Sequence, residues 1–145
     1  MAGKRRIWIG VWLGLALIGA AGCSDLAESR FATYAQAIQS GGFESGWLPE
    51  VIPDSASNIR EAHAAETNQV WVSFDFPLEA VESFASLCSP ISFDQVDLPD
   101  SGPRWWDTKV LKDPWNAFYV CGDPASLGYL AVLGTGDQAY YWSYR

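Results

Sequence analysis

The stretch QVWVSFDFP, residues 69–77, carries the clearest periodicity in the chain. Every second residue from position 70 to 76 is apolar, so one face of a strand would hold Val70, Val72, Phe74 and Phe76. The other face would hold Trp71, Ser73 and Asp75. This period of two predicts a β-strand with one face packed against the core. Pro77 suits the first position of a helix. The following residues, PLEAVESFASLC, place an apolar stripe at helical spacing, which predicts a helix over 77–88 with Cys88 turned inward.

Two further helices are expected on the N-terminal side of this strand. Leu26, Phe31, Ala35 and Ile38 recur at helical spacing before Gly41 and Gly42, which predicts a helix from about 25 to 40. Asn58 stands three residues before Glu61, as in a capping box, which predicts about two turns of helix ending at Thr67 and Asn68.

The C-terminal part is expected to form an antiparallel meander after a loop over 89–104. The predicted strands are 105–111, 117–121, 128–133 and 139–144, separated by the turn signals KDPWN, GDPASLG and GTGDQ. Together these elements predict an α+β fold. It would be a small antiparallel sheet of about four or five strands, packed against two main helices and one short helix.

The N-terminus has the marks of a secretory signal. Lys4, Arg5 and Arg6 precede an uncharged run over 7–21, which is shorter than the roughly 20 residues that a membrane-spanning helix needs. The residues Ala20-Ala21-Gly22-Cys23 then resemble the lipobox of bacterial lipoproteins, although Ala20 stands where leucine is commonest. The resemblance implies cleavage of residues 1–22, lipidation of Cys23, and a single domain over 23–145 anchored to the membrane. Ser24 favours the outer membrane, facing the periplasm, with the inner membrane as the alternative.

Removal of residues 1–22 takes away three of the nine basic residues and none of the 17 acidic ones, so the net charge falls from −8 to −11. So acidic a surface argues against nucleic acid as a partner. With Cys23 assigned to lipid, Cys88 and Cys121 remain as an even pair in an exported protein, and we expect a disulfide between them.

No catalytic or metal-binding set emerges from the sequence, and no cofactor is expected. His63 is the only histidine, whereas a hydrolytic metal site needs at least three protein ligands, and no nucleophile motif such as GxSxG is present. Asp94, Asp97 and Asp100 lack the spacing of a calcium loop. The aromatic residues offer a candidate interaction surface, made of Trp47, His63, Trp105, Trp106 and Trp115. Such rings serve protein interfaces, saccharide binding or simple packing.

The segment from Gly46 to Asn68, GWLPEVIPDSASNIREAHAAETN, the strand VWVSFDF, the late Cys121-Gly122-Asp123 and the terminal Trp142-Ser143-Tyr144-Arg145 together resemble a group of small bacterial lipoproteins and exported proteins of undefined role. This resemblance covers most of the mature chain and implies an envelope protein, with no catalytic residues to transfer. We therefore expect a non-enzymatic interaction or assembly module with an envelope protein partner. The alternative is a cell-wall or glycan-binding module that uses exposed tryptophans, and a hydrolase ranks third.

Overall fold

A computed structural model describes residues 26–123 and 126–144. In chain order the elements are β1 (Leu26–Thr33), α1 (Tyr34–Gln39), β2 (Ser57–Ala64), β3 (Gln69–Asp75), η1 (Leu78–Ala80), α2 (Val81–Ala85), β4 (Cys88–Ile91), η2 (Phe93–Gln95), α3 (Thr108–Leu111), β5 (Ala117–Cys121), β6 (Gly128–Val132) and β7 (Gln138–Tyr144). Within the described residues no helix is long and apolar enough to cross a membrane.

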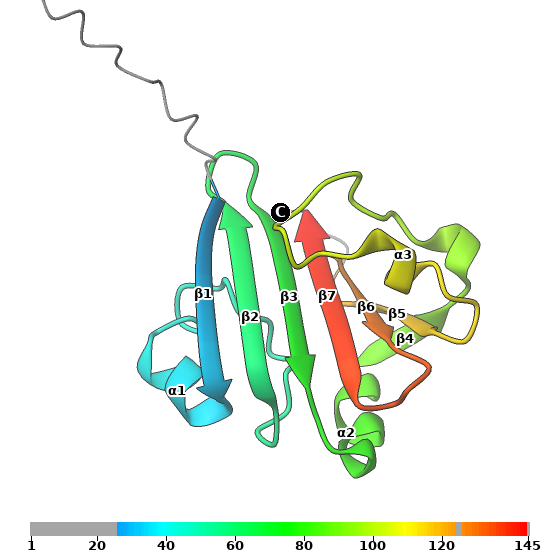
Figure 1. Cartoon of the computed structure of the whole chain (residues 1–145), viewed down its shortest axis with the longest axis horizontal. Coiled ribbons are helices and arrows are strands. Elements are labelled where there is room, and N and C mark those ends of the chain that lie inside the picture. The colour runs from blue at the N-terminus through cyan, green and yellow to red at the C-terminus, as the bar shows by residue number, and fades with distance from the viewer. Residues whose placement is uncertain (1–25, 124–125, 145) are drawn as a thin grey trace, which may run out of the picture.

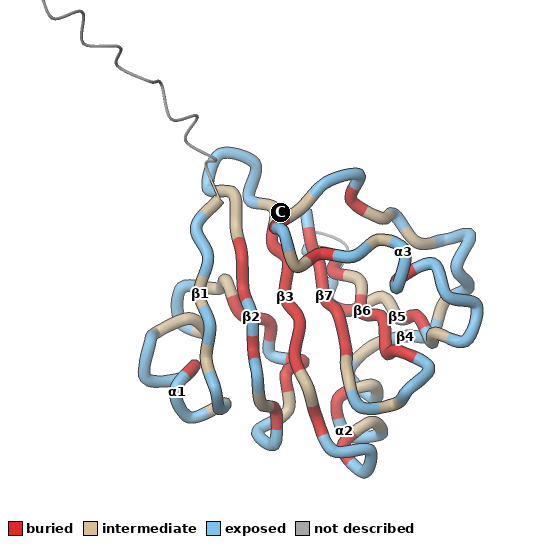
Figure 2. Tube along the Cα trace, viewed as in Figure 1, coloured by how far each residue is buried: buried red, intermediate tan, exposed pale blue. Residues whose placement is uncertain are grey.

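All seven strands join one antiparallel sheet in the order β1-β2-β3-β7-β6-β5-β4 (Figure 1). The C-terminal strands run as the expected meander, and β7 pairs with β3 to join the two halves of the sheet. The strands β3 and β7 lie at the centre, where Figure 2 shows them buried along most of their length. Their position explains why β3 carries large apolar side chains on both faces.

The sheet separates two hydrophobic clusters. We call the side of Val70 and Val72 the valine face; it is covered by α1, by the loop over 40–56 and by α2, which contributes Phe84. We call the side of Trp71 and Trp142 the tryptophan face; the segment over 92–116, including α3, covers its β3–β7–β6–β5 part. The indole of Trp142 donates a 2.6 Å hydrogen bond to the Asp97 carbonyl, which fastens this segment to the sheet.

The expected fold class is wrong, because the described residues are mostly β and contain no main helix. The segment expected as a helix over 25–40 is helical only at α1, and its first part is the edge strand β1. The short helix expected after Asn58 is the strand β2. Both segments obtain their hydrogen bonds from neighbouring strands rather than from their own turns, so tertiary pairing overrides the local spacing of apolar residues.

Two local features account for the remaining differences. Asn58 does not cap a helix: it has φ +49° beside the irregular register of β2 and β3, and its amide donates to Asp75 Oδ2 at 2.8 Å. Asparagine tolerates this left-handed conformation better than most residues. The strand expected over 105–111 is a turn followed by α3, whose first turn is capped by Asp107 through the Lys109 N–H at 2.9 Å.

The expected helix over 77–88 is partly correct. It exists as η1 followed by α2, but it ends before Cys88, which begins β4. The other three residues of β4, 89–91, fall within the expected loop over 89–104. Cys88 and Cys121 lie directly opposite each other in the β4–β5 pair, with Cα atoms 4.3 Å apart, and they form the expected disulfide. This confirmed bond fixes the short edge strand β4 to the sheet.

Candidate functional site

Two of the residues singled out in the sequence, Trp47 and His63, lie together on the valine face. Their rings stack with centroids 3.8 Å apart and planes inclined by 7°. The imidazole Nδ1 of His63 lies 2.7 Å from Glu61 Oε1. Since Glu61 and His63 are two residues apart on β2, they point to the same side of the strand. Trp47 lies in the loop over 40–56, and this loop places its ring against His63.

Burial raises the pKa of Glu61, and the hydrogen bond and the charge of His63 act against that rise. Glu61 is only 3% exposed, so its carboxylate depends on its partners in place of water. The Ser29 hydroxyl on β1, opposite Glu61 in the register, also acts to lower the pKa of Glu61. The order of these contacts differs from that of a nucleophilic triad, in which the hydroxyl bonds to the imidazole. Here the hydroxyl acts on the carboxylate, so the cluster holds β1, β2 and the Trp47 loop together.

The three remaining tryptophans of the expected surface lie elsewhere. Trp106 is part of the core on the tryptophan face, where its ring meets those of Tyr140 and Trp142 edge-on at 5.4 Å and 5.6 Å. Trp105 is half-buried beside it. Trp115, at the turn before β5, is 83% exposed. The structure thus brings Trp47 and His63 together but does not assemble all five residues into one surface. Cys23, the expected lipidation site, lies outside the described residues.

A polar hollow on the tryptophan face was not foreseen from the sequence. It encloses about 330 Å³ over β1, β2 and β3, and its polar lining is Arg30, Asn58, Arg60, Ser73, Asp75 and Gln138. Arg30 and Arg60 are directly opposite each other in the β1–β2 register. The sequence prediction missed this pair because it placed the two arginines on separate helices. The signal in the sequence is that basic residues are scarce in this acidic chain, so each arginine is a candidate for a specific role.

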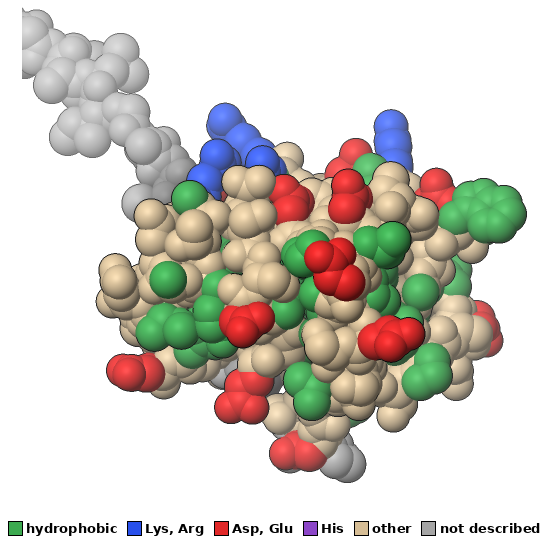
Figure 3. All heavy atoms as spheres, turned by 90° about the horizontal axis from the view of Figure 1, so that it is seen from below, with side chains coloured by type: hydrophobic (Ala, Val, Ile, Leu, Met, Phe, Trp, Pro, Cys, Tyr) green, Lys and Arg blue, Asp and Glu red, His purple; other side chains and the backbone are tan. Residues whose placement is uncertain are grey.

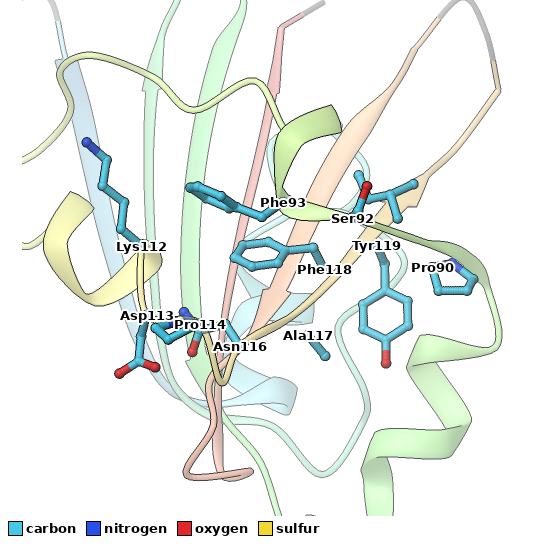
Figure 4. A pocket seen from close by; sticks show the side chains of 11 residues that line it. Pro90, Ser92, Phe93, Lys112, Asp113, Pro114, Asn116, Ala117, Phe118 and Tyr119 are labelled. Atoms are coloured by element: carbon cyan, nitrogen blue, oxygen red, sulfur yellow. The ribbon is translucent and has the colours of Figure 1, made fainter.

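An apolar pocket of about 450 Å³ lies where β4 ends and β5 begins (Figure 4). The rings of Phe93 and Phe118 lie over one another in it, with centroids 5.3 Å apart. Lys112 and Asp113 stand on the opposite side of the pocket, on the turn after α3. Phe93 is 45% exposed, so part of this apolar surface meets solvent.

Among the described residues, no group of three or more His, Cys, Asp and Glu side chains is placed to hold a metal ion. A family model described as the YbbD head domain matches residues 25–75. Comparison with curated proteins and with solved structures finds no match. The matched segment ends with β3, so it corresponds to one half of the sheet together with the Trp47–His63–Glu61 cluster and the two arginines. The match indicates a bacterial protein and names no activity.

Proposed function

We propose that this chain is an exported, lipid-anchored envelope protein that works as a non-enzymatic interaction module. Its partner is another envelope protein, which contributes an extended segment that pairs with the edge of β1. The observation that carries this proposal is the difference between the two edges of the sheet.

The edge at β4 is better protected than the edge at β1, where the protective features are the charged side chains of Glu28 and Arg30. The strand β4 has four residues, contains Pro90 and is tied to β5 by the disulfide, which are features that discourage pairing with another chain. The strand β1 has eight residues without proline or lysine. Among the described residues, a side chain occupies this edge at its end, where the Gln36 side chain accepts the Ala32 N–H at 2.9 Å. A long edge with unpaired backbone groups is the template that strand addition requires.

The position of β1 next to the expected anchor supports the same proposal. Leu26 is three residues from Cys23, a distance of at most about 10 Å for an extended chain. A lipid on Cys23 would hold the β1 edge close to the bilayer, where a membrane-associated partner is concentrated. The acidic surface fits a protein partner better than an anionic lipid surface. In Figure 3 the carboxylates are spread over the visible face, whereas lysine and arginine side chains are confined to one rim.

Site-specific photocrosslinking in cells tests this proposal. A photoreactive residue at Glu28, which is exposed on β1, is compared with one at Ser89, which is exposed on the opposite edge strand. We expect Glu28 to capture one segment of a single envelope protein, as mapped by mass spectrometry, and the product to disappear when Cys23→Ala removes the anchor. Equal capture from Ser89, or no specific product from Glu28, would reject the β1 edge as the interface.

The exposed ring of Trp115 supports a second candidate, binding of cell-wall glycan. A flat indole that is 83% exposed can stack on the apolar face of a sugar. Titration with soluble wall fragments should then quench tryptophan fluorescence, and Trp115→Ala should abolish the quenching. Quenching that persists in this variant would remove the candidate, because Trp115 is the most exposed of the described aromatic side chains.

A further inference from the structure

Arg30 and Arg60 form an unusual contact for an acidic protein. They are direct cross-strand neighbours, both exposed on the tryptophan face. Only six basic residues follow position 22, and two of them meet here. Within residues 26–123 and 126–144, the one ion pair joins His63 to Glu61, so neither arginine has a carboxylate within ion-pair distance. Like charges directly opposite each other destabilise a sheet, and no described carboxylate forms an ion pair with either arginine.

Two acidic residues, Asp75 and Glu28, share this face of the sheet with the arginines, and neither forms an ion pair with them. Asp75 lines the same hollow, but its two oxygens accept hydrogen bonds from Asn58 at 2.8 Å and from Gln138 at 3.1 Å. Glu28 lies two residues before Arg30 on the same face of β1, at the position opposite Ala62. The two guanidinium groups are therefore left with unused donors at the wall of a hollow.

The surroundings of the arginines suit a small ligand. The register places Arg30, Arg60, Ser73 and Tyr140 in one row across β1, β2, β3 and β7. The covering segment over 92–116 stops short of β1 in Figure 1, so the row is open to solvent at the arginine end. The hollow of about 330 Å³ lies at the small end of the range of ligand sites. A guanidinium group offers two parallel donors that match the oxygens of a carboxylate or a phosphate.

We infer that Arg30 and Arg60 together bind a small oxyanion, a carboxylate or a phosphate group, in the hollow between β1 and β3. The anion places its negative charge between the two guanidinium groups and removes their mutual repulsion. The Ser73 hydroxyl lies next in the row and is a further donor for the bound group. This inference does not depend on the proposed interaction at the β1 edge, and the crosslinking result does not bear on it.

Thermal unfolding at low and constant ionic strength tests the inference, with inorganic phosphate and N-acetylalanine as probes and chloride as the reference anion. Vesicles containing phosphatidylglycerol form a third arm, which separates a lipid headgroup from a free anion. The variants are Arg30→Gln and Arg60→Gln. The matched control is Lys109→Gln, which removes the same charge from an exposed position on α3.

Two results are expected together. Without a probe, each arginine variant should unfold at a higher temperature than the wild type, because the repulsion is gone, and Lys109→Gln should not. With at least one probe, the wild type and Lys109→Gln should gain about 3 °C or more at saturation, and the arginine variants should lose most of that gain. A gain that survives in both arginine variants, or no gain with any probe, overturns the inference.

Discussion

The replacement Gly128→Ala tests the packing of the valine face. The sign of the change in the free energy of unfolding shows whether the greater strand propensity of alanine or a clash with its neighbours is the larger effect. Gly128 is the first residue of β6, where glycine is less favourable than alanine, so that alanine in open space would stabilise the protein by at most about 0.5–1 kcal/mol. The space is not open. A Cβ at this position would overlap the end of the Tyr141 ring, at Oη, Cζ and Cε2. Tyr141 is 6% exposed and its ring is rigid, so it has little room to withdraw.

We therefore expect Gly128→Ala to lower the free energy of unfolding by about 1–3 kcal/mol, the usual cost of overpacking a core. Urea unfolding followed by tryptophan fluorescence measures this value. In a Tyr141→Leu background the clash is absent, and the same replacement should be neutral or stabilising. A stabilising effect in the wild-type background, or an equal loss in both backgrounds, would show that Tyr141 does not occupy the space above Gly128.

Three further predictions concern other parts of the sheet. Burial raises the pKa of Glu61 above its ordinary value of 4.5, so the native state binds this proton more tightly than the unfolded state and stability falls as pH rises from about 4.5 through the native pKa. Glu61→Gln should reduce the dependence of stability on pH in this range. An unchanged slope would show that another group causes the pH dependence. Replacing Cys88 and Cys121 by alanine should lower the free energy of unfolding by about 3.5–4 kcal/mol, from the 33-residue separation that the disulfide closes; a loss below about 1 kcal/mol in chemical denaturation would count against this loop-entropy account. Because Asn58 has φ +49° and bonds to Asp75, Asn58→Ala should cost about 1–2 kcal/mol more than Asn58→Gly in the same assay, and the reverse order would refute the backbone argument.

The central and C-terminal strands could be predicted from the sequence because their signals are local. In β3, the apolar residues Val70, Val72 and Phe74 alternate with a face that holds Ser73 and Asp75, which produces a period of two that a helix would not. Turn residues bound β5, β6 and β7 closely enough for each strand to be placed. The disulfide followed from the even number of cysteines left after Cys23, without knowledge of the fold.

The N-terminal strands could not be predicted from the sequence. The strand β1 is an edge strand and pairs with a neighbouring strand on one side only. Its side chains alternate only weakly in polarity, and Leu26 and Phe31 happen to fit a helical spacing as well. In β2, the spacing of Asn58 and Glu61 resembles a capping box in the sequence, but Glu61 and His63 point to a covered face of the sheet. Both segments are strands because β3 offers an edge for β2, and β2 then offers one for β1.

The sequence by itself determined the alternation of β3, the C-terminal meander and the pairing of Cys88 with Cys121, because each depends on residues close together or on their number. Only the tertiary structure decided what lies across the sheet. It stacked Trp47 on His63, buried Trp106 and placed Arg30 opposite Arg60. Cross-strand neighbours are set by register between segments that are distant in the chain, and register is a property of the assembled sheet.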